Sequence, residues 1–228
     1  MKCYKYTLNM GMLNFIAILL FFICLFIVGS TYGEIVIHNP VLLVSLGMLY
    51  FILHELVHYV GFIINKEVKS KNVVLGAEIE KGVLYCMCKQ EIHKKTIMIS
   101  IFAPLVVIGI ITLIIGMYFH LDLLIILSIT NISGATGDIM MGLFLLKLPK
   151  DIKYIDFDDC TSFCILSKKD LTKYKMLGIK FIESIPYTKD IGPKDFKKIS
   201  ISKTSLWIFI ILIIITIVGG IFLWKKLF

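Results

Sequence analysis

Apolar residues along this 228-residue chain gather into long runs, separated by short polar or lysine-rich connectors. A transmembrane helix needs about 20 predominantly apolar residues. Five runs approach or exceed that length, at residues 11–29, 41–64, 96–119, 123–146 and 206–224. Trp207 and Trp224 frame the last run, as is typical of the membrane interface. The pattern therefore predicts about five transmembrane helices.

Two longer connectors depart from the helical pattern. Residues 65–95 carry two short strand-like runs, 73–75 and 83–88, with a turn at Lys81-Gly82, which predicts a β-hairpin. Residues 147–203 predict two further strands, at 154–157 and 163–166, and a helix over 170–184 capped by Asp170. We therefore expect an all-α membrane protein with a small cytoplasmic β-hairpin insertion and a small cytoplasmic α+β segment before the last helix.

This organisation divides the chain into five segments. Residues 1–10 form a short polar head to the first helix, Pro40 suits the first turn of the second, and Pro104 is expected to kink the third. The segments are 1–64 (helices 1 and 2), 65–95 (cytoplasmic hairpin), 96–146 (helices 3 and 4), 147–203 (cytoplasmic lysine-rich segment) and 204–228 (helix 5).

Composition and charge support a multi-pass protein of the cell membrane. The chain is 58% hydrophobic, above the level of soluble domains. Its net charge is +8 and all 24 basic residues are lysines, which disfavours nucleic-acid binding and fits contact with anionic lipid headgroups. Seven lysines lie in 65–95 and thirteen in 147–203, whereas the connectors 30–40 and 120–122 have none. The positive-inside rule therefore predicts a cytoplasmic N-terminus.

The sequence His54-Glu55-Leu56-Val57-His58 lies inside the second apolar run. On a helix, His54 and His58 are one turn apart on the same face, so both imidazoles can bind one zinc ion. Glu55 is then placed to act as the general base toward the attacking water. A helix end that exposes three polar residues is the alternative, but the apolar sequence continues through 59–64.

Asp138 is the candidate third ligand. Runs 41–64 and 123–146 are predicted to cross the membrane in the same direction, so depth can be counted from their cytoplasmic ends. His58 then lies roughly 9 Å deep and Asp138 roughly 12 Å deep, at 1.5 Å per residue. A buried carboxylate needs a partner, and zinc is one, although a helix-capping role is the alternative. Asn131, on the same face as Asp138, either binds substrate backbone or forms an interhelical hydrogen bond.

Four motifs carry a resemblance to a known family. They are HELVH at 54–58, Tyr85-Cys86-Met87-Cys88-Lys89, Ala103-Pro104-Leu105 and Gly137-Asp138. Over roughly residues 49–166 the chain resembles the "putative zincin peptidase" family of bacterial membrane proteins, and it is more distantly similar to the site-2 proteases. The latter likeness implies His54, His58 and Asp138 as metal ligands and Glu55 as base. The Asp-Gly pair expected of site-2 proteases is absent, because Ile139 follows Asp138.

Cysteines offer a competing metal site. Cys86 and Cys88, with Cys160 and Cys164, could form a zinc cluster. A cytoplasmic location instead favours reduced thiols, and alternate cysteines on a strand favour packing on one face of the hairpin.

The favoured function is an intramembrane zinc metalloprotease with one catalytic Zn²⁺. Its substrate would be a membrane-associated peptide or protein, cut near the cytoplasmic face of the lipid bilayer. A catalytically inactive zinc-binding scaffold or helper protein is the alternative. An ion transporter is a third reading, disfavoured because the other apolar runs hold almost no polar residues along a path. The sequence gives no indication of oligomeric state.

Overall fold

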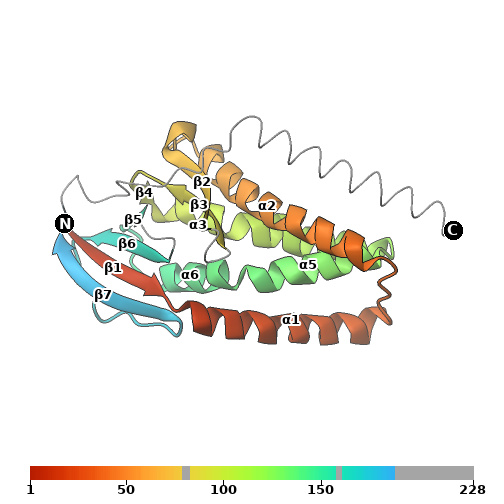
Figure 1. Ribbon diagram of the computed structural model, residues 1–228. Coiled ribbons are helices and arrows are strands. Elements are labelled where there is room, and N and C mark those ends of the chain that lie inside the picture. Colours follow the sequence, from red (N-terminus) through yellow and green to blue (C-terminus); the bar gives the residue numbers. More distant parts are fainter. Residues whose placement is uncertain (79–82, 158–160, 188–228) are drawn as a thin grey trace.

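The computed structural model describes residues 1–78, 83–157 and 161–187, so the apolar run predicted at 206–224 lies outside the described residues. The helices run side by side, and the strands gather at one end of them (Figure 1). Three helices are long and apolar enough to cross a membrane, and a bent pair makes a fourth when it is counted as one span. They are α1 (Met10–Tyr32), α2 (Pro40–Ile64), the composite helix Lys94–Tyr118, and α5 (Asp122–Gly134) with α6 (Thr136–Lys147). This composition indicates membrane association.

Asparagine side chains start the first two long helices. The Asn9 side chain accepts the backbone N–H of Met12 at 3.2 Å, and the Asn39 side chain accepts that of Leu42 at 3.0 Å. Pro40 follows Asn39 at the start of α2, as predicted, where its missing N–H removes no helical hydrogen bond. These caps define where α2 begins and hence where its histidines lie.

The third span is interrupted at Pro104. It comprises α3 (Lys94–Pro104), a π-helical segment η3 (Leu105–Ile111) and α4 (Thr112–Tyr118). Proline has no N–H to donate to the preceding turn, and its ring crowds the carbonyl four residues back. The sequence predicts a kink at Pro104, and the structure places a widened helical segment directly after it.

The all-α prediction is wrong, because the described chain is a mixed helix-and-sheet protein. An antiparallel five-stranded sheet, in the order β4-β5-β6-β1-β7, lies at the end of the helices where α1 begins and α6 ends (Figure 1). Its strands are β1 (Lys2–Leu8), β4 (Ile92–His93), β5 (Lys153–Asp156), β6 (Ser162–Ser167) and β7 (Ile179–Pro186). Three distant parts of the chain therefore build one layer.

The predicted polar head is strand β1, which occupies an interior position between β6 and β7. Tyr4 pairs with Ile165 on one side and with Ser184 on the other. Both partners are far away in sequence, so seven residues at the start of the chain give no local sign of their pairing. β1 is nevertheless well suited to the sheet, because Tyr4 and Tyr6 are almost completely buried.

The helix predicted over 170–184 is also absent. Asp170 accepts the backbone N–H of Thr172 at 3.0 Å, so it closes a short Asx turn instead of capping a helix. Gly178 then adopts φ +78°, a left-handed conformation that favours glycine, and β7 begins at Ile179. Aspartate favours both helix caps and turns, so Asp170 by itself does not distinguish a helix start from a turn, and the helix prediction was wrong.

Other predicted strands are confirmed. The hairpin between α2 and α3 consists of β2 (Val73–Glu78) and β3 (Val83–Cys88), in register from Val73–Cys88 to Glu78–Val83. It follows a short 3₁₀ turn, η1 (Ser70–Asn72). The strands expected at 154–157 and 163–166 correspond to β5 and β6. The predicted turn residues Lys81 and Gly82 lie outside the described part of the chain.

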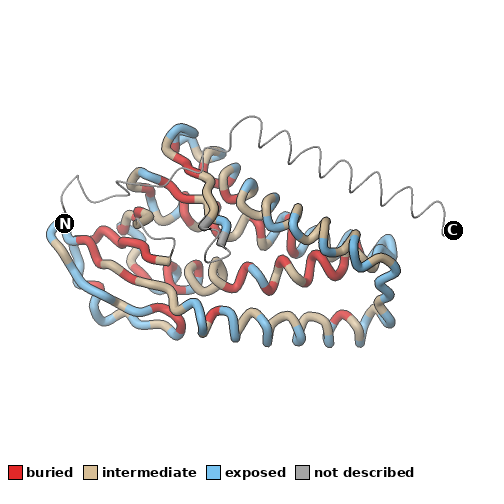
Figure 2. The backbone as a smooth tube through the Cα atoms, viewed as in Figure 1, coloured by how far each residue is buried: buried red, intermediate tan, exposed pale blue. Residues whose placement is uncertain are grey.

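Aromatic packing joins the sheet to the helices. The Tyr6 ring of β1 contacts Phe144 of α6 edge-on, with ring centroids 4.8 Å apart, and stacks on Phe163 of β6 at 5.8 Å. Tyr154 of β5 stacks on the other side of Phe163. Figure 2 shows buried positions in this region and along α5, whereas α1 is mostly exposed or half-buried along its length. The sheet is thus fixed against the end of α6.

A disulfide links Cys3 of β1 to Cys164 of β6, with Cα atoms 5.8 Å apart. Disulfides persist mainly in oxidising compartments, whereas the lysine distribution predicts that this sheet lies in the cytoplasm. The two indicators of sidedness disagree, and the cytoplasmic N-terminus stays a prediction. The bond also removes Cys164 from the alternative cysteine cluster, while Cys86 and Cys88 are free thiols.

Candidate metal centre

His54 and His58 lie one turn apart on α2 and face the same way. Their Nε2 atoms are 3.1 Å apart, and the ring centroids are 4.7 Å apart. The side chains are 13% and 10% exposed, so the pair is shielded although other faces of α2 are open. The helical spacing of HELVH thus brings both imidazoles to one point.

Asp138 reaches this point from the other bent span. The sequence predicts one continuous helix over 123–146, but α5 and α6 meet at Ala135 with a bend of 46°. Asp138 lies in the first turn of α6, just after the bend. Its Oδ2 is 3.0 Å from Nε2 of His54 and 3.4 Å from Nε2 of His58. His58 and Asp138, which were predicted to lie at about the same depth, are therefore in direct contact.

The outer nitrogens of both imidazoles are committed to oxygen acceptors. Nδ1 of His58 is 2.8 Å from the carbonyl oxygen of Ser100, which can only accept, so this nitrogen carries the proton. Asn131 donates from Nδ2 to the Pro104 carbonyl at 3.3 Å, so its Oδ1 accepts from Nδ1 of His54 at 2.9 Å. In the neutral form that metal binding requires, both imidazoles consequently present the lone pair of Nε2 to each other and to Asp138.

Three acceptor atoms therefore converge with no proton of a neutral imidazole between them. Such a set is repulsive unless a cation lies among the atoms. The separations of 3.0, 3.1 and 3.4 Å are close to the roughly 3.3 Å expected between tetrahedral zinc ligands about 2.0–2.1 Å from the metal. The oxygen and nitrogen donors are also those that zinc accepts. The residues present fit a zinc ion.

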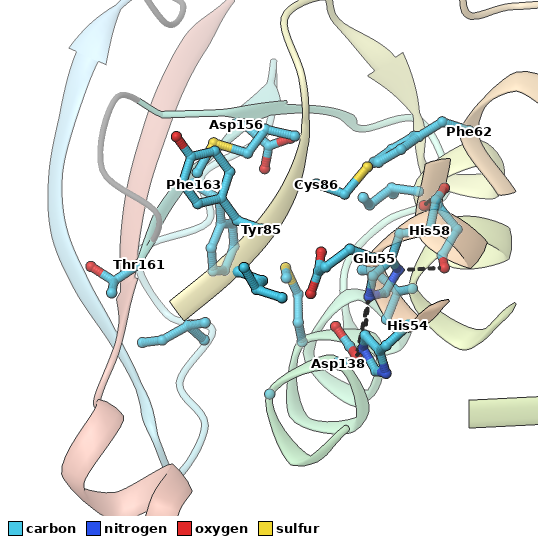
Figure 3. Close-up of a pocket in the computed structure, with 18 of the residues that line it drawn as sticks. His54, Glu55, His58, Phe62, Tyr85, Cys86, Asp138, Asp156, Thr161 and Phe163 are labelled. Atoms are coloured by element: carbon cyan, nitrogen blue, oxygen red, sulfur yellow. Dashed lines mark hydrogen bonds and ion pairs between the residues drawn. The ribbon is translucent and has the colours of Figure 1, made fainter. Parts of the chain in front are cut away.

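Glu55 is the other carboxylate beside the histidines. Its ligand atom and those of His54 and His58 lie within 4.8 Å of one another, which makes these three residues a possible metal-binding group as well. Figure 3 shows Glu55 pointing from α2 toward the cavity, with Asp138 beside the histidines. The backbone N–H of Cys86 on β3 donates a hydrogen bond to Glu55. Glu55 thus lies between the histidines and the hairpin.

Asn131 and Ser100 orient the histidines, and the sequence indicates this only in part. Of the two predicted roles for Asn131, the structure contains the interhelical hydrogen bond, whereas substrate binding stays a prediction. Ser100 acts through its backbone carbonyl, so its residue type gives no signal. Its hydroxyl donates back to the carbonyl of His58 at 2.9 Å. Such outer hydrogen bonds fix the tautomer and orientation of metal-binding histidines.

Gly61 allows this close approach of α2 and α3. A Cβ atom at Gly61 would lie 2.7 Å from the Cα of Ser100, closer than real contacts allow. Glycine at this position therefore lets the backbone of α3 come near enough for the Ser100 carbonyl to meet His58. Small residues at helix contacts serve the same purpose in other membrane proteins.

A cavity of about 240 Å³ opens beside the histidines. Its walls come from α2 and α6 on one side and from β3, β5 and β6 on the other, so the unpredicted sheet supplies part of the site. Figure 3 shows Asp156 and Phe163 across the cavity from His54 and Asp138. Its lining from the strands includes Leu84, Tyr85, Cys86, Met87, Tyr154, Asp156, Ser162 and Phe163.

Asp156 is the functional candidate that sequence analysis missed. Its carboxylate accepts the backbone N–H of Cys88 at 2.7 Å and the hydroxyl of Tyr154 at 2.6 Å. Burial raises the pKa of the Asp156 carboxyl to about 6, and the same cause raises the pKa of the Cys88 thiol to about 12. Asp156 lies in a lysine-rich segment with several acidic neighbours, so only the three-dimensional fold distinguishes it.

Comparison with known proteins gives one match. No curated protein and no solved structure matches the chain. A family model described as "Putative zincin peptidase" matches residues 47–153, which include His54, Glu55, His58 and Asp138. This match supports a metallopeptidase function and implies zinc. Over these residues, just under half of the chain, the sequence is similar to the family described as "Putative zincin peptidase".

Proposed function

We propose that this chain is an intramembrane zinc metallopeptidase that hydrolyses a peptide bond of a membrane-associated substrate near the cytoplasmic face. One observation carries the proposal. Two imidazole Nε2 atoms and one carboxylate converge while both Nδ1 protons are held by Ser100 and Asn131. The family match and the apolar helices support the same conclusion.

His54, His58 and Asp138 would hold the metal. A zinc ion in this position acts as a Lewis acid, which polarises the scissile carbonyl and lowers the pKa of the attacking water. Asp138 contributes the negative charge that offsets part of the charge of the cation inside the apolar bundle. Asn131 and Ser100 keep each Nε2 directed at the same point.

Glu55 would move the proton. It follows His54 directly on α2, and its carboxylate extends into the cavity where a substrate carbonyl and a water molecule can meet (Figure 3). A carboxylate there takes the proton of the attacking water and passes it to the leaving amine. The hydrogen bond from Cys86 positions this carboxylate between the histidines and the hairpin.

The hairpin offers an edge for an extended substrate. β3 pairs with β2 on one side only within the described residues, and Leu84 through Met87 line the cavity. The N–H groups of Cys86 and Cys88 point away from β2, to Glu55 and Asp156 respectively. A transmembrane helix must unwind before hydrolysis, and a strand edge can pair with the unwound segment where its N–H groups are not already bonded.

The Glu55→Ala variant tests the proposal. The purified protein should keep its zinc and lose cleavage of quenched fluorogenic transmembrane peptides by at least about 100-fold, since a positioned general base contributes roughly 10²–10⁴. Glu183→Ala, an exposed glutamate on β7, is the matched control and should retain both properties. Unchanged cleavage by Glu55→Ala would remove Glu55 from the mechanism, and a zinc-free native protein would refute the metallopeptidase.

A further inference from the structure

Asp156 is a cavity-lining carboxylate without a cationic partner. Its two oxygens accept from Cys88 and Tyr154, and no ion pair of Asp156 occurs among the residues that the structure describes. Carboxylates removed from water are normally paired with a cation or metal. Neither hydrogen bond supplies a positive charge, so no group in the described part of the chain neutralises Asp156 by direct contact.

The whole cavity is acidic, although the chain is basic. Three carboxylates line it, from Glu55, Asp138 and Asp156, and none of its described lining residues is a lysine. The net charge of the chain is +8, so lysines are abundant elsewhere. One divalent cation at the histidines balances two of the three negative charges. One negative charge therefore stays available to a substrate.

The surroundings of Asp156 suit a long cationic side chain. Tyr85, Tyr154 and Phe163 line the same cavity and offer aromatic surface. Lysine and arginine bury their aliphatic stems against such surface while the charged group reaches an acceptor. Each oxygen of Asp156 accepts one of these two hydrogen bonds and keeps a further lone pair.

We propose that Asp156 forms a cation-binding subsite that selects substrates with a lysine, an arginine or a free α-amino group near the scissile bond. This inference rests on the proposed peptidase function, because it assigns the specificity of the same cavity. The membrane setting supplies such substrates. Segments of membrane proteins next to the cytoplasmic face are enriched in lysine and arginine.

The experiment compares matched peptides. Each quenched fluorogenic transmembrane peptide carries lysine, arginine, citrulline or norleucine at one test position. The set of peptides places this residue at successive positions on both sides of the cleavage site. Acetylated and free N-termini separate a side-chain cation from an α-amine. Wild type should prefer a cation by roughly 10- to 100-fold in kcat/KM, the range expected for a charged hydrogen bond. Asp156→Asn should bring the lysine-to-norleucine ratio close to one.

The controls separate this inference from the peptidase proposal. Asp151→Asn removes an exposed carboxylate that pairs with Lys169, and it should leave the ratio unchanged. Zinc content and thermal melting report whether the Asp156→Asn variant folds. If this variant does not fold, the lysine-to-norleucine ratio of the wild-type protein tests the cation preference by itself. Anisotropy titration of the same peptides into zinc-loaded Glu55→Ala measures the preference without turnover.

Equal cleavage of lysine and norleucine peptides by wild type at every position would overturn the cation subsite while leaving the peptidase intact. No cleavage of any peptide, together with tighter binding of cationic peptides that requires Asp156, would overturn the peptidase and leave the subsite standing. Equal binding of all peptides would overturn the subsite in either case.

Discussion

Two aspartates share one cavity and have opposite surroundings. Asp138 lies at a bend between membrane helices and faces two imidazoles at 3.0 and 3.4 Å. Asp156 lies on a strand and meets only a backbone N–H and a tyrosine hydroxyl. The first has two imidazole neighbours that can ligate one metal together with it, whereas the second has no cationic partner within residues 1–78, 83–157 and 161–187. This difference underlies the two proposals above, in which Asp138 is a metal ligand and Asp156 binds a cationic group of the substrate.

The largest expected difference between the two aspartates is in zinc binding. Asp138→Asn should lower zinc affinity by more than about 100-fold, because removal of a ligand exceeds the 10- to 100-fold effect of outer partners. Asp156→Asn should keep zinc near the wild-type level. Metal content after gel filtration against a graded chelator measures both variants. Equal losses would show that the two carboxylates do not have separate roles.

A smaller effect is expected at Asn131. Asn131→Ala removes the acceptor for Nδ1 of His54, so zinc affinity should fall roughly 10- to 100-fold while the protein stays folded. Asn131→Asp keeps an acceptor and should recover most of that affinity. The chelator competition above measures both. If the Asn131→Ala variant binds zinc as tightly as wild type, the hydrogen bond to Asn131 does not orient His54.

Two glycines near the site allow a test of packing. Gly61→Ala should destabilise the protein by about 1–3 kcal/mol, because its Cβ would meet Ser100 at 2.7 Å and α2 would have to move. Gly137→Ala is the matched change beside Asp138, where nothing lies within 4 Å of the added carbon, and it should be tolerated. Thermal unfolding in detergent compares them. A stable Gly61→Ala protein would contradict the close α2–α3 contact.

The smallest effect is a pH dependence of substrate preference. Burial raises the pKa of Asp156 to about 6, so the carboxyl is charged above that pH and neutral below it. Preference for lysine over norleucine should therefore be full at pH 7.5 and shrink several-fold as pH falls through 6. The titratable groups that face Asp156 are Tyr154, Cys86, Cys88 and His58. None of these four is a second carboxylate that could lose its charge in place of Asp156. A preference that stays constant from pH 7.5 to 5.5 would assign the selection to another group.

Sequence reasoning succeeded where the information is local. The four-residue spacing of His54 and His58 defines one face of a helix, and counting residues from span ends brought Asp138 to the same level. The hairpin strands β2 and β3 are neighbours in the chain, and their pattern was also sufficient. The histidine pair and the hairpin follow from one helical period and one short connection, whereas Asp138, 84 residues from His54, was placed by counting along two predicted spans.

It failed where partners are distant in the chain. β1 pairs with strands more than 150 residues away, and the sequence around Lys2–Leu8 does not indicate these partners. The bend at Ala135 falls within a stretch long enough for a single span, and neither side of it contains a proline to mark a break. Asp156 gains its significance only because β5 packs beside β3. These features arise from tertiary contacts, which composition and periodicity do not contain.

The interior place of β1 has a consequence for how the protein is made. β1 precedes both of its neighbours in the chain, and β6 and β7 are synthesised only after α1 through α6. Until β6 and β7 have been synthesised, β1 lacks both of the strands with which it forms hydrogen bonds. Because β6 also lines the cavity, the wall opposite His54 and Asp138 is completed only after α1 through α6 have been synthesised.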